Sequence, residues 1–236
     1  MKWLSRGRRS PPPASAHAAA LERYDSTRNF RAKTRTRDLR LVIVDVETTG
    51  LRPYHDRLLA LGAVAMTEEL IRLDDTFEVT VRQDAPSAPE NILVHGIDGT
   101  AQTSGPHAAD ALAAFLDFAQ DAPLIAFHAE FDRVFVTRAL REALGVTPHN
   151  VWLDLAELAP AVFSEHAAKA QTLDDWTALF GIENAARHEA LADAVATAQL
   201  LQVVLARASQ LGLTRFADLT ARAKDQRWLA RSLKTR

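Results

Sequence analysis

Hydrophobic residues along the chain change from continuous runs to helical spacing, and this change predicts an α/β fold. Residues 41–47 form a run rich in β-branched side chains that ends in acids, which is typical of a central strand buried on both faces. Residues 58–65 predict a second strand and residues 71–81 a third. The gap between these two strands is short enough for an antiparallel hairpin.

Helical spacing dominates after about residue 105. It covers residues 108–118, 132–144, 173–180 and 189–210. A short buried strand is predicted at residues 123–127, between the first two of these stretches. Three early strands followed by alternating helices and strands predict an α/β domain, in which a mixed sheet is flanked by helices.

Charge is strongly segregated along the chain despite a net charge of −2. Residues 1–40 hold eleven Lys/Arg against three Asp/Glu, and residues 213–236 hold seven against two, so the middle carries a net charge of −15. An acidic body between basic ends fits a metal-dependent enzyme that acts on a polyanion, and basic ends that are merely solvated tails fit equally well. We divide the chain into a basic N-terminal extension (1–38), flexible or partly helical, a globular domain (39–212) and a basic C-terminal segment (213–236).

The chain has no cysteine, which excludes a disulfide framework, a thiolate nucleophile and a zinc–sulfur site. No apolar run approaches the roughly 18–20 residues that span a bilayer, and no signal peptide opens the chain. We therefore expect a soluble, cytoplasmic protein with no membrane partner. The Arg-rich, acid-poor start also resembles an organellar transit peptide, which the sequence leaves open as an alternative.

Acidic residues lie at the end of the first predicted strand and near two later helix starts. Asp45 and Glu47 are two residues apart, so they project from one face of a strand. Such close like charges cost stability unless a cation lies between them. Asp132 begins one predicted helix, and His188 precedes Asp193 at the start of another. Because Mg²⁺ and Mn²⁺ take oxygen ligands, the pattern predicts a two-metal phosphodiesterase site.

Each of these motifs also has a purely structural interpretation. Asp45 and Glu47 would face solvent at a strand end, and Asp132 would be an N-cap for the helix that follows it. His188 would be a cap or a surface residue. The order of the motifs along the chain, strand end followed by two helix starts, favours a shared site.

In that order the motifs resemble those of the DnaQ-like 3′–5′ exonucleases, also called the DEDD family. The family's strand ending in Asp-x-Glu-Thr-Thr-Gly is similar to residues 45–50, and its Phe-Asp motif to residues 131–132. His188 lies five residues before Asp193, as in the histidine subclass. The resemblance covers residues 41–205 and implies a ribonuclease H-like fold with a mixed five-stranded sheet.

The resemblance implies a role for each acidic residue. Asp45, Glu47 and Asp193 would bind the first of two Mg²⁺ or Mn²⁺ ions, Asp45 would be shared with the second, and Asp132 would support the site. His188 would be the general base that deprotonates the attacking water.

Seven further residues would bind the 3′-terminal nucleotide by this resemblance. They are Thr48, Gly50 and Leu51 after the first strand, His95 in a Val-His-Gly-Ile stretch, and Phe127, His128 and Phe131 around the second motif. Many relatives have His-Asn where this chain has Phe127 and His128. The difference leaves substrate preference open, since Phe127 would either stack on a base or fill the core.

The resemblance implies a 3′–5′ exonuclease domain at residues 39–212 that releases nucleoside 5′-monophosphates from single-stranded DNA in proofreading or repair. An exoribonuclease with the same chemistry and a non-catalytic nucleic-acid-binding module are the alternatives. The expected partners are single-stranded nucleic acid, DNA rather than RNA, and a polymerase. Residues 210–214, Gln-Leu-Gly-Leu-Thr, resemble peptides that bind sliding clamps, although Gly212 is also explained as a helix stop.

Overall fold

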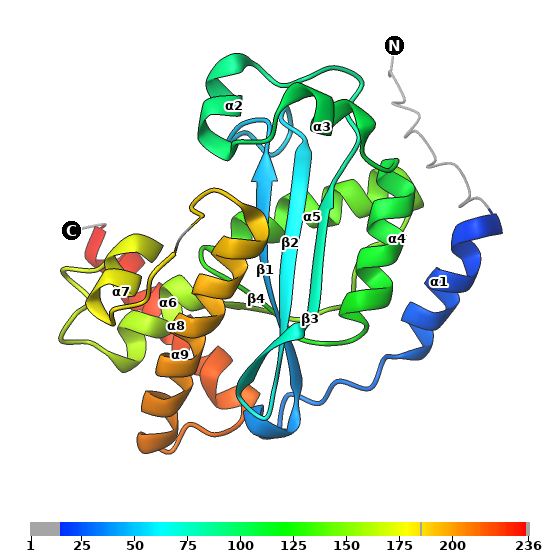
Figure 1. Ribbon diagram of the computed structural model, residues 1–236. Coiled ribbons are helices and arrows are strands. Elements are labelled where there is room, and N and C mark those ends of the chain that lie inside the picture. Colours follow the sequence, from blue (N-terminus) through cyan, green and yellow to red (C-terminus); the bar gives the residue numbers. More distant parts are fainter. Residues whose placement is uncertain (1–14, 185, 235–236) are drawn as a thin grey trace, which may run out of the picture.

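A mixed sheet of five strands forms the centre of the computed structural model, which describes residues 15–184 and 186–234 (Figure 1). The strands are β1 (Arg40–Thr48), β2 (Leu58–Thr67), β3 (Leu70–Thr80), β4 (Leu124–Ala126) and β5 (Trp152–Asp154). Their order is β3-β2-β1-β4-β5. β1, β2 and β3 form an antiparallel meander, whereas β4 and β5 are added parallel to β1. The predicted mixed five-stranded sheet is confirmed.

Helices cover both faces of this sheet. They are α1 (Ser15–Ser26), α2 (Pro89–His95), α3 (Gly99–Ser104), α4 (Ala108–Ala119), α5 (Ala129–Leu144), α6 (Leu155–Val162), α7 (Leu173–Leu179), α8 (Ala190–Gln210) and α9 (Phe216–Lys234), with a 3-10 turn at Thr36–Asp38. In Figure 1, α6 to α9 lie on one side of the sheet and α1, α4 and α5 on the other. Helices α2 and α3 form a lobe above the end of β1.

The alternation of side chains along β1 decides which face carries its acids. Leu41 and Ile43 pack in the hydrophobic cluster under α6 to α9, whereas the valines that alternate with them pack under α1, α4 and α5. Successive side chains of a strand point to opposite faces. Asp45 and Glu47 are in phase with Leu41 and Ile43, so they project toward the face that α8 covers.

A glycine in β2 lets α8 lie directly against the sheet at this point. Gly62 is the antiparallel partner of Asp45. A Cβ atom at Gly62 would lie 2.2 Å from the carbonyl carbon of Ala190 and from the backbone nitrogen of Leu191. No side chain fits in that space, and the first turn of α8 therefore lies over the end of β1, bringing Asp193 toward Asp45.

Both basic flanks contribute helices that pack on the central domain. Tyr24 of α1 is 1% exposed and lies in the cluster with α4. Phe216, Leu219 and Ala223 of α9 are buried in the cluster with α6 and α8. Their spacing of three and four residues places them on one face of the helix. The described part of the C-terminal segment, residues 213–234, thus adds to the core, while residues 1–14 and 235–236 lie outside the described part of the chain.

The structure does not support the interpretation of Asp132 as the N-cap of its helix. Helix α5 begins at Ala129, three residues earlier than predicted, because His128 adopts φ +64° and occupies the N-cap position. Asp132 lies in the first turn of the helix, three residues after its first residue, so its interpretation as an N-cap is wrong. The short elements α2, α3, α6 and β5 were not predicted, since three to eight residues carry too little periodicity.

The clamp-like segment forms the turn between α8 and α9. Gly212 has φ +78°, and Leu213 packs against the core cluster under α8 and α9. The Thr214 carbonyl accepts a hydrogen bond of 3.0 Å from the Thr36 backbone. The segment therefore forms the end of α8 and a turn at the surface, and it is not presented as an extended peptide.

Helix α8 corrects the expectation that no segment approaches the length of a membrane span. It has 21 residues and a mean hydropathy of 1.3, which by length and composition alone suffices to cross a membrane. However, 56% of its most apolar window is buried inside the fold. Its apolar character is explained by this packing, since a helix buried on most sides is hydrophobic on most sides.

Replacing Gly62 with Ala should be among the more damaging single-methyl changes in the protein. We expect the free energy of unfolding to fall by about 3 kcal/mol, because the added methyl group overlaps the α8 backbone and the helix has to shift. Urea unfolding measures this. Gly181→Ala is the matched control: its φ of +66° imposes strain of about 1 kcal/mol, but its surroundings are open. Equal losses in the two variants would contradict close packing at Gly62.

Candidate active site

The end of β1 is fixed by a tight polar turn. The pairing of β1 with β2 shifts register between Glu47 and Thr48. The Thr48 hydroxyl donates a hydrogen bond of 2.7 Å to the Gly50 carbonyl, and the Asn91 amide donates to the Thr49 carbonyl. Asn91 belongs to α2, so the turn after Glu47 is attached to the lobe above it.

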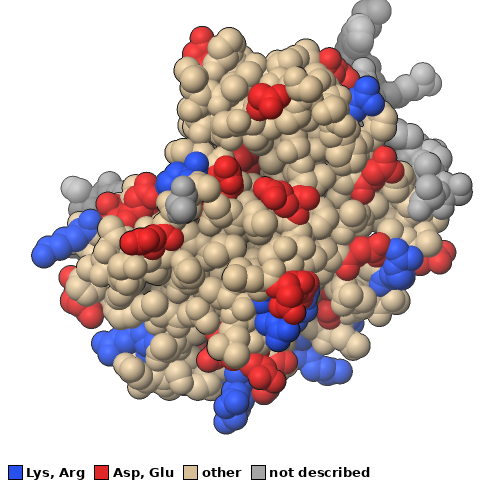
Figure 2. Space-filling model, viewed as in Figure 1, with Lys and Arg blue, Asp and Glu red and all other residues tan. Residues whose placement is uncertain are grey.

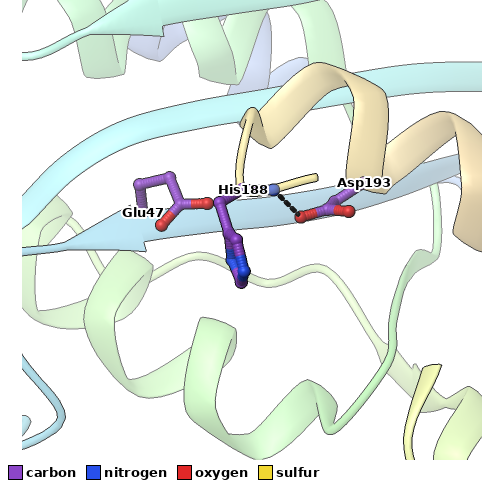
Figure 3. A group of neighbouring side chains, drawn as sticks. All are labelled: Glu47, His188 and Asp193. Atoms are coloured by element: carbon purple, nitrogen blue, oxygen red, sulfur yellow. Dashed lines mark hydrogen bonds between the residues drawn. The ribbon is translucent and has the colours of Figure 1, made fainter. Parts of the chain in front are cut away.

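Asp193 is held by the segment that leads into α8. Its side chain is buried, and one carboxylate oxygen accepts hydrogen bonds from Asn184 and, at 2.6 Å, from Arg187. The other oxygen accepts the backbone N–H of His188 at 3.0 Å, as Figure 3 shows. His188 has φ +66°, a region that residues with a Cβ atom rarely adopt. The surrounding structure therefore holds His188 in a strained backbone conformation next to Asp193.

Three of the predicted site residues converge here. A ring nitrogen of His188 and carboxylate oxygens of Glu47 and Asp193 all lie within 4.8 Å of one another. In Figure 3 His188 stands between the two acids, which come from β1 and from the start of α8, and its imidazole points away from the line that joins them. His188 is exposed whereas Asp193 is buried, so the histidine lies on the solvent side of the group.

Asp45 belongs to the same cluster, because neighbouring acids of the site shift its pKa. Burial raises the pKa of Asp45 well above its ordinary range, and the charges of Asp132, Asp193 and Glu47 raise it further. Burial and the charge of Asp193 likewise raise the pKa of Glu47 to about 7. The positive charge of Arg187 acts against both shifts. The acids are thus close enough to destabilise one another's charged forms.

Asp132 comes from α5 and has a fifth acid, Asp154, near it. Burial raises the pKa of Asp132, and Asp154 adds to this, although the backbone N–H groups of Asp132 and Val46 favour its charged form. Asp154 ends β5 and accepts backbone N–H groups of His128 at 3.1 Å and Ala156 at 3.0 Å. Asp154 was not predicted from the sequence, although an acid at the end of a short apolar strand repeats the pattern of Asp45.

This cluster fits a divalent cation. Burying several carboxylates together is unfavourable unless protons or cations neutralise them. Oxygen donors from β1, α5 and α8 are the ligand type that Mg²⁺ and Mn²⁺ prefer. Figure 2 shows acidic side chains near the middle of the viewed face, below the α2–α3 lobe, with a basic side chain next to them.

The residues expected to contact a nucleotide are placed unequally. Leu51 is 82% exposed, and Thr48 and Gly50 are partly exposed in the turn after β1. His95 is only 2% exposed; its ring contacts the Ser87 hydroxyl and accepts the Ile97 backbone N–H at 3.1 Å. Its imidazole therefore stabilises the lobe from within and offers little surface to a ligand.

The aromatic residues around the second motif are mainly packing residues in this structure. Phe127 is partly buried against the core cluster under α6 to α9, and its ring meets the exposed His128 edge-on at 4.9 Å. Phe131 packs on Phe135 at 4.8 Å between ring centres. Of the two interpretations of Phe127, core filling is the one that its observed contacts support.

The arrangement of these acids on this sheet defines the ribonuclease H-like class of fold. The model of a family described as "Exonuclease" matches residues 42–201. The chain belongs to this family, the DnaQ-like exonucleases.

The relatives with curated descriptions are much longer proteins, and the chain matches one part of each. The chain is 30% identical over 180 residues to "DNA polymerase III PolC-type" of Caldanaerobacter subterraneus subsp. tengcongensis, covering 76% of this chain and 12% of that protein. It is 32% identical over 206 residues to "DNA polymerase III subunit epsilon-like protein" of Rhodobacter capsulatus, covering 86% of this chain and 29% of that protein. The chain thus spans less than a third of either relative.

Solved structures with the same fold include E. coli exonuclease I. Its complex with a dT13 oligonucleotide matches with a TM-score of 0.62 and 21% identity, covering 73% of this chain and 42% of that one. A zinc-bound complex of the same enzyme with single-stranded DNA has a TM-score of 0.64, 20% identity and coverage of 74% and 42%. These likenesses confirm the ribonuclease H-like fold.

In EDTA, Glu47 should lower the free energy of unfolding progressively as the pH rises. An acid whose pKa is raised on folding stabilises the protein fully below its unfolded pKa, and this contribution is lost as the pH rises through the folded pKa. For Glu47 the window runs from 4.5 to about 7. Urea unfolding of the wild type and Glu47→Gln should show the difference between them shifting against the wild type by at most about 1.4 kcal/mol per pH unit.

The exposed Glu165 offers a matched control. Glu165→Gln should leave the pH dependence of the wild type unchanged. A difference between the wild type and Glu47→Gln that is flat across this window would contradict the raised pKa of Glu47.

Proposed function

We propose that the protein is a cytoplasmic 3′–5′ exonuclease that hydrolyses the terminal phosphodiester of single-stranded DNA with the help of two Mg²⁺ or Mn²⁺ ions. The observation that carries this proposal is the convergence of four acids from β1, α5 and α8 with an exposed histidine beside them. Membership of the exonuclease family supports the same reaction.

Each residue of the cluster has a distinct task in this proposal. Asp45, Glu47, Asp132 and Asp193 hold the two cations, which when bound favour the attacking water and the departing 3′ oxygen of an in-line displacement. His188 accepts the proton of the attacking water, a role that an imidazole beside the acids can take. Its exposure lets it pass that proton to solvent afterwards.

The surroundings of the cluster favour the end of a single strand. Leu51 projects from the turn after Glu47, and α2 adds Leu93, 86% exposed, and Val94, 58% exposed. Apolar side chains exposed on this turn and on the helix attached to it offer a surface against which an unpaired base can pack. A single strand is also what the described complexes of E. coli exonuclease I contain. Relatives described as DNA polymerase III support a role in proofreading or repair alongside a polymerase.

A 5′-labelled single-stranded DNA oligomer should be shortened stepwise from its 3′ end with Mg²⁺ or Mn²⁺, and not in EDTA. Asp45→Asn should abolish the reaction, because one cation ligand is lost, while leaving the urea midpoint of the metal-free protein at or above that of the wild type. A labelled RNA of the same sequence, run in parallel, should be degraded more slowly.

Asp84→Asn is the control, since the Asp84 side chain is 97% exposed and lies outside the cluster. It should keep full activity. Faster degradation of RNA would replace the DNA assignment with an exoribonuclease. Binding of the oligomer with no metal-dependent product would replace the enzyme with a nucleic-acid-binding module, and an active Asp45→Asn variant would remove the proposed site.

Replacing His188 with Gln should separate proton transfer from metal binding. We expect kcat to fall about 10²–10⁴-fold, the usual contribution of a general base. Mn²⁺ affinity, measured by calorimetry, should change little, because the acids remain and the His188 backbone N–H can still bind Asp193. Unchanged kcat would show that another group accepts the proton.

A further inference from the structure

Arg187 lies between a buried acid of the site and an exposed acid outside it. Its Nη1 donates to Asp193 at 2.6 Å. Its Nε and Nη2 lie 2.8 and 2.9 Å from the two oxygens of Asp174, near the start of α7. The Asp193 side chain is 5% exposed and that of Asp174 is 62% exposed. One guanidinium thus joins the interior of the acidic cluster to its rim.

The charge of Arg187 reaches beyond this ion pair. Burial raises the pKa values of Asp45 and Glu47, and the guanidinium acts against both shifts. It therefore supplies to three acids part of the positive charge that a divalent cation would supply.

A cation bound by Asp193 would meet this guanidinium directly. The carboxylate oxygen that receives Arg187 also receives Asn184, and the second oxygen receives the His188 N–H. Both oxygens therefore already have donors. Positive charges about 4 Å apart repel one another even where solvent screens them. Arg187 and a metal ion cannot both lie against Asp193 at little cost.

We propose that Arg187 is the internal counter-ion of the metal-free site and competes with the divalent cation for Asp193. On metal binding its guanidinium withdraws from Asp193 and stays attached to Asp174, which already binds two of its nitrogens. The proposal rests on the proposed metal-dependent function. It makes Arg187 a residue that sets metal affinity.

His188 would take part in the exchange. It follows Arg187 directly and its backbone N–H binds the same carboxylate, with φ held at +66°. When the cation displaces Arg187 from Asp193, the residue directly before the proposed base His188 therefore moves. Arg187, which competes with the cation, and His188, the proposed base, lie on the same short segment before α8.

Calorimetric titration of the EDTA-stripped, dialysed protein with Mn²⁺ at low salt tests the competition. We expect Arg187→Gln to bind Mn²⁺ about tenfold more tightly than the wild type or better, because a nearby positive charge has been removed. Its metal-free form should unfold at a lower temperature than the wild type, and saturating Mn²⁺ should narrow that gap.

Arg133→Gln is the matched control. It removes the same charge from α5, but Arg133 pairs with the exposed Glu130 three residues before it. Its Mn²⁺ affinity should stay within about twofold of the wild type, as expected for an exposed pair. If Arg187→Gln fails to fold, Arg187→Lys, which keeps the charge but loses the fork that spans both acids, should show a smaller gain in affinity.

The outcomes separate the two proposals. Equal or weaker Mn²⁺ binding by Arg187→Gln, with the wild type binding normally, would overturn the competition and leave the metal site intact. In that case Arg187 positions Asp193 for the metal. Binding by the variant alone would support the competition strongly, and no binding by either protein would overturn both proposals.

Discussion

The close approach of α8 to β2 at Gly62 is the constraint on which the rest of the site depends. Asp45 and Asp193 are 148 positions apart in the numbering, and they meet because a helix backbone lies where a side chain would otherwise be. β1 supplies two acids in phase with its buried Leu and Ile residues. Only a helix packed this tightly brings a further acid to the same face. The absence of a side chain at Gly62 therefore allows the fold to bring the acids of the site together.

The same packing makes the site costly for the fold. Acids that are buried together raise one another's pKa, so the metal-free protein pays with lost stability for a geometry that suits a cation. Backbone N–H groups and one guanidinium offset part of this cost at Asp132 and Asp193. A site that was fully neutralised by its own side chains would bind a metal ion more weakly.

Sequence pattern predicted strands β1 to β3 and helices α4, α5 and α8, because each has enough residues to show a period, but it did not predict the 19-residue helix α9. It also brought Asp45 and Glu47 to one face, since strand alternation is a local property. It missed Asp154, which ends a three-residue strand, and Arg187, whose importance depends on contacts with Asp174 and Asp193. The inward orientation of His95 could not be predicted either, because burial of a polar ring depends on distant partners.

The contrast between Asp132 and Asp193 shows how helix starts serve this site in two ways. Asp132 lies inside the first turn of α5 and receives backbone N–H groups, which stabilise its charge without a side-chain cation. Asp193 lies in the first turn of α8 but is bound by Arg187 and Asn184 as well as by the His188 backbone. The first arrangement is rigid, since one of the backbone donors belongs to strand β1 and the other to α5, and neither can move without disturbing its element. The second can change by moving one side chain, so the adjustable part of the site lies at the start of α8.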